Sequence, residues 1–183
     1  MSAHRRFASL VLTGLLALTG CGTGEAGGTT PDPGTLATVA SQTATPAPNS
    51  SAAVPERLAF TAKSLDGKEF AGASLAGKPA VLWFWAPWCP KCRAAGPDVA
   101  KVAQTVTVVG VAGLSEDTAS MRDFVSATKT GGFTHLGGGS TEVWKRFGIT
   151  SQHTFVLIDS AGAVTYTGSL DAAGLASRVA ELR

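Results

Sequence analysis

The spacing of hydrophobic and polar residues divides the chain into three parts. A short apolar stretch at residues 7–18 follows a positively charged N-terminus. The segment 21–55 is rich in Gly, Thr, Ala, Ser and Pro and has no apolar periodicity, so we expect a disordered linker there. From residue 56 onward, apolar runs alternate with turn signals, as in a folded domain. We therefore expect one domain over residues 56–183.

Within this domain, short apolar runs of strand length alternate with segments of helical periodicity. The two continuous apolar runs are expected to be strands buried on both faces. Pairs of runs separated by turn residues predict a hairpin at each end of the domain. The predicted strands are 58–62, 68–70, 80–85, 105–111, 133–136, 154–158 and 164–167, and the predicted helices are 89–104, 118–127, 140–147 and a last one capped by Ser169. This order predicts an α/β fold with a mixed central sheet, helices on both faces and an N-terminal β-hairpin.

Composition and charge narrow the class of protein. The chain has 183 residues, of which 44% are hydrophobic, and this is enough for one well-formed core. Its net charge is +2, and Arg5 and Arg6 account for that surplus, so the rest of the chain is balanced. Because no basic block or interleaved aromatic–basic pattern occurs, we expect no nucleic-acid binding.

The N-terminus has the features of an export signal. Residues 4–6 are basic, and the apolar stretch 7–18 is too short to cross a bilayer. It ends in Leu-Thr-Gly-Cys at residues 18–21, which resembles a bacterial lipobox. The resemblance implies that 1–20 is a lipoprotein signal peptide and that Cys21 carries lipid, which would anchor the protein at the outer face of the cytoplasmic membrane. The alternative is an ordinary secretory signal followed by an incidental cysteine.

The other two cysteines, Cys89 and Cys92, stand at the junction of a predicted strand and a predicted helix. Cys89 falls at the helix N-terminus, where free backbone N–H groups and the helix dipole stabilise a thiolate. Lys91 adds a positive charge, and Pro90 suits the first helical turn. Because Cys92 lies one turn further, it can close a disulfide. We expect Cys89 to be the nucleophile and Cys92 the buried resolving thiol.

The cysteine pair could serve two other roles. A structural zinc site needs two more ligands, and beyond the signal segment only His135 and His153 remain, without zinc-finger spacing. His135 has no partner signal and is expected to be structural. A permanent disulfide is possible in an oxidising compartment, but such a short loop constrains the unfolded chain little. A reversible redox pair explains the pattern better.

The sequence FWAPWCPKC, with Pro97 five residues after Cys92, resembles the active site of the thioredoxin fold. Residues 56–183 resemble the TlpA/DsbE-like group, in particular actinobacterial exported disulfide oxidoreductases of DsbE/DsbF type. The resemblance implies a thioredoxin fold and an enzyme that exchanges disulfides with exported protein thiols or disulfides. We further expect a monomeric domain, no cofactor and a membrane redox partner that resets the pair. Because Trp88 directly precedes Cys89, we expect it to be half exposed, where it could contact a client peptide. The sequence leaves open whether the protein oxidises or reduces its clients. We favour oxidation, because a stabilised thiolate makes the disulfide a stronger oxidant.

Three positions depart from the family pattern. Trp83 stands where thioredoxin has a buried acid, and Ala95 stands where many TlpA-like proteins have a glutamate. Both acids help proton transfer at the buried thiol, so that role is unfilled or served by water. His153 stands where the family has a cis-proline facing the cysteines, and we expect its peptide bond to be trans.

Three interpretations of His153 stay open. The residue could simply fill the loop, or its imidazole could stabilise the Cys89 thiolate or relay a proton. The third interpretation rests on a resemblance to Sco-type copper chaperones, which carry a histidine in this loop. In that case Cys89, Cys92 and His153 would bind Cu(I) as a soft sulfur and nitrogen ligand set.

Overall fold

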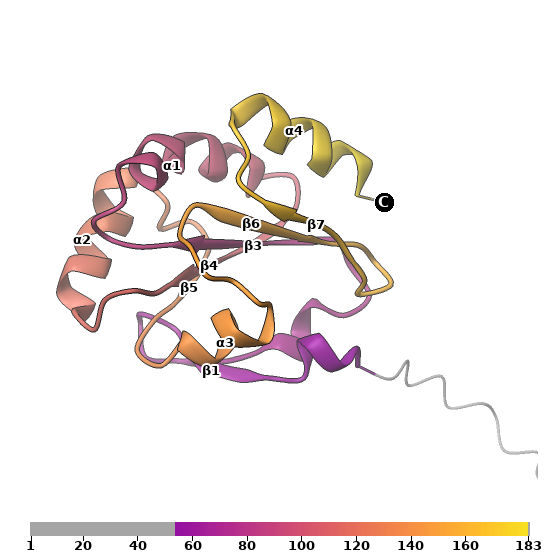
Figure 1. The fold of residues 1–183 in the computed structure, drawn as a ribbon, viewed down its shortest axis with the longest axis horizontal. Coiled ribbons are helices and arrows are strands. Elements are labelled where there is room, and N and C mark those ends of the chain that lie inside the picture. The colour runs from indigo at the N-terminus through magenta and orange to yellow at the C-terminus, as the bar shows by residue number, and fades with distance from the viewer. Residues whose placement is uncertain (1–53, 183) are drawn as a thin grey trace, which may run out of the picture. The chain divides into compact units, whose positions relative to one another are not determined.

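The computed structural model describes residues 54–182 (Figure 1). The predicted signal peptide, the lipid site at Cys21 and nearly all of the predicted linker lie outside the described residues. Within them, the helices are α1 (Pro90–Val102), α2 (Thr118–Thr128), α3 (Thr141–Arg146) and α4 (Ala172–Glu181), with short 3-10 turns η1 (Glu56–Leu58) and η2 (Gly72–Leu75). The strands are β1 (Thr61–Lys63), β2 (Glu69–Ala71), β3 (Ala80–Trp85), β4 (Thr107–Ala112), β5 (Thr134–Leu136), β6 (Thr154–Ile158) and β7 (Val164–Gly168).

Five strands form a mixed sheet in the order β5-β4-β3-β6-β7. The β3–β4 and β4–β5 pairs are parallel, and the β3–β6 and β6–β7 pairs are antiparallel. Helices α1, α2 and α4 cover one face, while α3 and the β1–β2 hairpin lie on the other (Figure 1). The predicted mixed sheet with helices on both faces is confirmed.

Strand β3 is the centre of the molecule. All six of its residues are buried, because it lies between β4 and β6 and is covered on both faces. Val81, Trp83 and Trp85 belong to the core cluster under α1, α2 and α4, whereas Leu82 and Phe84 belong to the opposite cluster. Fully burying a large apolar side chain stabilises a fold by roughly 1.5–3 kcal/mol. The strand is therefore held rigidly, and so is the loop that follows it.

Several boundaries differ from the sequence prediction by one to three residues, and two of the differences have a clear local cause. The last helix is capped by Asp171, whose Oδ1 accepts a hydrogen bond from the Gly174 N–H at 2.8 Å. Ser169 lies before the cap, and its carbonyl accepts from the Tyr166 hydroxyl instead, so the predicted Ser169 cap is wrong. The first strand begins later than predicted because Leu58 N–H donates to the Pro55 carbonyl and closes a 3-10 turn. In both cases a local side-chain or turn hydrogen bond set the boundary.

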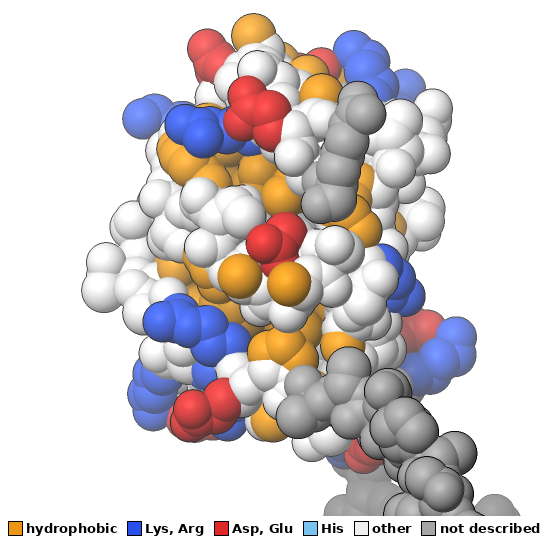
Figure 2. Space-filling view, turned by 90° about the vertical axis from the view of Figure 1, so that its right-hand side faces the viewer, with side chains coloured by type: hydrophobic (Ala, Val, Ile, Leu, Met, Phe, Trp, Pro, Cys, Tyr) orange, Lys and Arg blue, Asp and Glu red, His pale blue; other side chains and the backbone are white. Residues whose placement is uncertain are grey.

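The surface shows no concentration of one charge on the face drawn in Figure 2. Basic, acidic and hydrophobic side chains are interspersed there. This agrees with the small net charge of +2. Among residues 54–182, no helix is both long and apolar enough to cross a membrane.

His135 is a buried polar residue of the core, on the edge strand β5. Its Nε2 lies 2.9 Å from the Thr130 carbonyl oxygen, so Nε2 carries the proton and Nδ1 is the unprotonated nitrogen. Among residues 54–182, neither His135 Nδ1 nor Trp85 Nε1 has a hydrogen-bond partner. Both atoms face the space over Gly110, where a Cβ would lie 2.9 Å from Trp85 Nε1 and closer still to His135 Nδ1. Burial lowers the pKa of His135 from 6.5 to about 4.

We predict that His135 makes stability depend on acidity. A neutral buried imidazole favours the folded state above its unfolded pKa, and this contribution is lost as the pH falls from 6.5 toward about 4. The free energy of unfolding should therefore drop by about 3 kcal/mol over that range. Urea unfolding at several pH values gives the free energy of unfolding of the wild type and of His135→Phe, and the wild type should show the steeper dependence on pH. Parallel pH profiles for the two proteins would contradict the assignment.

Candidate active site

The two cysteines lie where β3 leaves the sheet and α1 begins. A disulfide joins Cys89 to Cys92, with 5.3 Å between their Cα atoms. Cys89 is the N-cap of α1, and its Sγ accepts a hydrogen bond from the Cys92 N–H at 3.1 Å. Pro90 occupies the first turn, where a missing N–H costs nothing. The sulfur of Cys89 thus receives one of the free N–H groups that begin the helix.

Both cysteines are buried, with Cys89 3% exposed and Cys92 0% exposed. Both belong to the core cluster that also holds Trp83 and Trp85. They differ in their place on the helix, because Cys89 is the cap of α1 and Cys92 lies within its first turn.

The loop between β3 and α1 is tied to its neighbours by side-chain and backbone contacts. The Cys89 N–H donates to the Ala86 carbonyl at 3.1 Å and closes a tight turn. One guanidinium nitrogen of Arg93 donates to the Pro87 carbonyl at 3.2 Å, and the same group lies 5.4 Å from the centre of the Phe124 ring. These contacts fix the first turn of α1 against α2. The loop after β3 and helix α2 therefore both hold Cys89 in position.

His153 lies close enough to Lys91, the residue after Pro90 in the cysteine loop, for the lysine charge to act on its imidazole. Burial and the Lys91 charge together lower the pKa of His153, and the backbone of Leu170 opposes the shift. The ring packs edge-on against Phe155 at 5.6 Å. The described part of the chain has no cis peptide bond, as expected for a non-proline here, and His153 has a φ of +60°. A left-handed backbone at a histidine is uncommon and marks a constrained position.

Trp88 makes a contact that the sequence did not reveal. Its indole Nε1 donates to the carbonyl oxygen of Leu114 at 3.0 Å. Leu114 follows β4 in a loop and has a φ of +55°. One signal in the sequence could have indicated this contact. Leu114 directly follows a strand that runs parallel to β3, so it lies at the sheet edge where the carboxyl ends of both strands meet.

The two positions without acids are apolar in the structure as well. Trp83 is fully buried and stacks on Phe155 with ring centres 6.4 Å apart. Ala95, in α1, is half-buried against the same core cluster. Neither residue can accept a proton from Cys92. The proton of the Cys92 thiol must therefore exchange through another group.

The structure gives no support to the copper interpretation. In the part of the chain that is described, no group of three His, Cys, Asp or Glu residues is arranged to hold a metal ion. That statement includes Cys89, Cys92 and His153. The disulfide also removes both thiolates that such a site would need.

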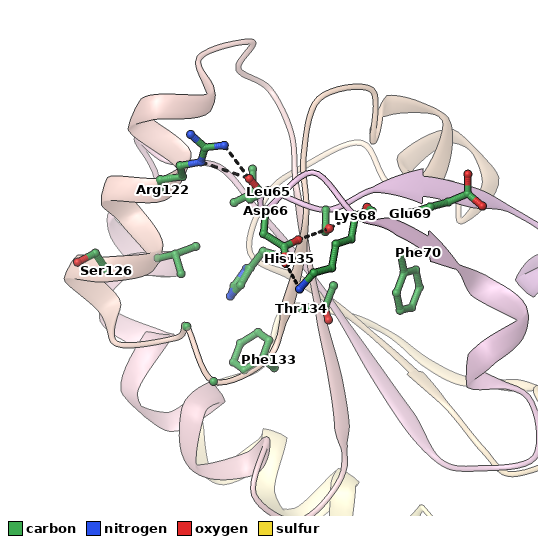
Figure 3. A pocket seen from close by; sticks show the side chains of 14 residues that line it. Leu65, Asp66, Lys68, Glu69, Phe70, Arg122, Ser126, Phe133, Thr134 and His135 are labelled. Atoms are coloured by element: carbon green, nitrogen blue, oxygen red, sulfur yellow. Dashed lines mark hydrogen bonds and ion pairs between the residues drawn. The ribbon is translucent and has the colours of Figure 1, made fainter.

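A cleft of about 730 Å³ lies away from the cysteines, between the β1–β2 hairpin, α2 and β5 (Figure 3). Its two basic side chains are already engaged. Lys68 pairs with Asp66 at 2.8 Å, and Arg122 donates twice to the Leu65 carbonyl at 2.9 and 3.2 Å (Figure 3). We assign no ligand to this cleft, and none of its lining residues belongs to the cysteine site.

A central strand, a Trp-Cys-Pro-Lys-Cys loop and a helix capped by the first cysteine define a thioredoxin-like disulfide site. The model of the AhpC/TSA family matches residues 53–167. The chain therefore belongs to the AhpC/TSA family, within the thioredoxin-like proteins. The predicted fold class is confirmed by this match and by the solved structures below.

Close relatives are mycobacterial. The soluble secreted antigen MPT53 of Mycobacterium tuberculosis is 43% identical over 137 residues, which cover 71% of this chain and 78% of the relative. The structure of MTB dsbF in mixed oxidized and reduced forms is 44% identical with a TM-score of 0.67, and covers 71% of this chain and 99% of that one.

A second solved structure is a secreted Mycobacterium tuberculosis disulfide oxidoreductase homologous to E. coli DsbE. It is 42% identical, has a TM-score of 0.63 and covers 69% of this chain and 98% of its own. The expected kinship with DsbE/DsbF-type proteins is confirmed. So is the enzyme class at the level of the family, because these relatives are disulfide oxidoreductases.

The geometry predicts an acidic Cys89 thiol in the reduced protein. The Cys92 N–H at 3.1 Å, the helix N-terminus and the Lys91 charge all favour the thiolate. In a Cys92→Ala variant, which isolates Cys89, thiolate absorbance should titrate well below the ordinary cysteine value of about 8.5. Adding Lys91→Ala should move the titration part of the way back. A midpoint at or above the ordinary value would contradict an activated nucleophile.

Proposed function

We propose that this protein is an extracytoplasmic thiol–disulfide oxidoreductase that exchanges disulfides with exported proteins through Cys89 and Cys92. The observation that carries the proposal is the disulfide at the start of α1, in which Cys89 is the cap of the helix and Cys92 lies within its first turn. A structural staple would gain little from so short a loop, and would not need this helix terminus. The secreted disulfide oxidoreductases among the relatives support the same function.

The exchange balances in two steps. A client thiolate attacks the Cys89 sulfur, the bond between Cys89 and Cys92 breaks, and Cys92 leaves as a thiolate that takes up a proton. The second client thiolate then attacks the client sulfur of the mixed disulfide and releases Cys89. The client loses two electrons and two protons, and the cysteine pair gains them. The reverse sequence reduces a client disulfide.

The direction that we propose is oxidation of clients. Stabilising the reduced pair makes its disulfide a stronger oxidant, and the helix N-terminus and Lys91 act in that sense. A further disulfide-forming protein at the membrane must then reoxidise the pair in each cycle. This partner must be a thiol oxidant that accepts two electrons.

The location that we propose is the outer face of the cytoplasmic membrane. The proposal rests on the sequence 18–21, in which Cys21 would carry lipid, and on the signal-like residues 1–20. The secreted character of the relatives supports export. Anchoring would keep the domain near the membrane partner that resets it.

His153 is proposed to relay protons at the site rather than to stabilise the thiolate by charge. Because its pKa is lowered by burial and by Lys91, the imidazole is neutral near pH 7 and can accept a proton. This fills the role that the acids at positions 83 and 95 play in related proteins. The charge of Lys91, which stands between the two cysteines in the sequence, acts on this imidazole and supports the proposal.

Replacing His153 should slow exchange in a way that depends on pH. His153→Asn suits the left-handed backbone but cannot relay protons. At pH 7 the variant should exchange with a thiol peptide on the order of tenfold more slowly. The wild-type rate should also fall as the pH drops through the lowered His153 pKa, and this component should vanish in the variant. Equal rates and equal pH profiles would show that His153 only fills the loop.

Trapping tests the proposed function as a whole. Cys92→Ser removes the resolving thiol, so the Cys89 thiolate should form mixed disulfides with exported proteins that persist until a reductant is added. Non-reducing electrophoresis of the full-length protein expressed with its own signal detects them. Cys89→Ser is the matched control and should trap little, because its remaining thiol is 0% exposed. An absence of adducts with the first variant, or equal trapping by both, would contradict the assigned roles.

A further inference from the structure

Two exposed hydrophobic side chains lie together beside the disulfide. Among residues 54–182, the large hydrophobic residues that are exposed are Val54 at 42%, Trp88 at 56% and Leu114 at 53%. Trp88 directly precedes Cys89, and its indole holds the Leu114 carbonyl at 3.0 Å. Trp88 and Leu114 therefore form one apolar rim next to the Cys89 sulfur. Val54 stands at the start of the described chain.

The rim is held in place rather than loosely exposed. The Gly113 N–H donates to the Trp85 carbonyl at 3.0 Å, which ties the Leu114 loop to the end of β3. Gly113 also has no room for a side chain, since a Cβ there would lie within 2.7 Å of several Trp144 ring atoms. With its neighbour and its carbonyl both fixed, Leu114 is kept in the left-handed region at a φ of +55°. Leucine is unfavourable there, and exposure gives it no compensating packing.

We propose that Trp88 and Leu114 form a docking rim for an extended segment of an exported polypeptide that carries an apolar residue beside its cysteine. This inference rests on the proposed function and names its substrate class. Because Cys89 is only 3% exposed, a client sulfur that reaches it must also contact the residues around Cys89. A cysteine in an extended segment can reach Cys89 while the side chain next to it covers Leu114. A cysteine that is recessed in a folded client surface cannot make both contacts.

The size of the rim favours a transient peptide over a second copy of this chain. Stable protein interfaces bury about 1,200–2,000 Å² in total, far more than two partly exposed side chains supply. A small contact also suits an enzyme that must release each client after exchange. A small thiol reaches the sulfur without covering Leu114, so the rim distinguishes polypeptides from small thiols.

The test compares two dithiol peptides that reduce the oxidised protein. They differ only in Leu or Ser next to the first cysteine, and dithiothreitol serves as the small thiol. Stopped-flow tryptophan fluorescence follows the reduction of the disulfide. For the wild type, the Leu peptide should react about tenfold faster than the Ser peptide. Leu114→Asn, which accepts the left-handed backbone, should reduce that preference to twofold or less and leave the dithiothreitol rate unchanged.

Two variants serve as controls. Leu114→Met retains an apolar side chain and should retain the preference, and Val54→Asn removes the exposed hydrophobic residue distant in sequence from the site and should behave as the wild type. A preference that survives Leu114→Asn, or a wild type with none, overturns the docking rim while the proposed function stands. Failure of both peptides to reduce a protein that dithiothreitol does reduce overturns the proposed function itself. A dimer in sedimentation that Leu114→Asn dissociates would make the rim a self-interface and overturn the proposal.

Discussion

The site depends on one hydrogen bond, from the Cys92 N–H to the Cys89 sulfur at 3.1 Å, at the first turn of α1. It makes Cys89 the cap of the helix, so the Cys89 sulfur and the positive end of the helix dipole coincide. That arrangement requires a helix that starts at Cys89 and a strand that ends just before it and fixes its position. Strand β3 does so because it is buried along its whole length between β4 and β6. The buried strand thus positions the helix cap, and the cap sets the chemistry of the sulfur.

Aromatic side chains dominate the core around Cys92. Trp83 and Trp85 stack on Phe155 and Phe124 beneath the helices. This surrounds Cys92 with an apolar core and disfavours a charge there. The nearest resolved electrostatic effect lies outside this core, where the exposed Lys91 helps to lower the pKa of His153.

The sequence predicted most of the fold because its strongest signals are local. The apolar run over 80–85 and the cysteine spacing identified β3, the start of α1 and the redox pair. The Ser169 cap was wrong because serine and aspartate both cap helices, and only the chain path decides that Asp171 does so here. The contact between Trp88 and Leu114 could not be predicted, since it joins two loops through a backbone carbonyl. The expectation that His153 faces the cysteines rests on a family resemblance and stays a prediction, and its left-handed backbone could not be predicted.

The reduction potential of the Cys89–Cys92 pair tests the central claim, that this disulfide is a reversible switch rather than a staple, most directly. It is measured by equilibrating the protein with glutathione redox buffers and quantifying the oxidised fraction. A thiolate stabilised by the helix terminus and Lys91 predicts a potential more oxidising than the thioredoxin value of about −270 mV. A potential at or below about −300 mV, the range of structural disulfides, would contradict the account.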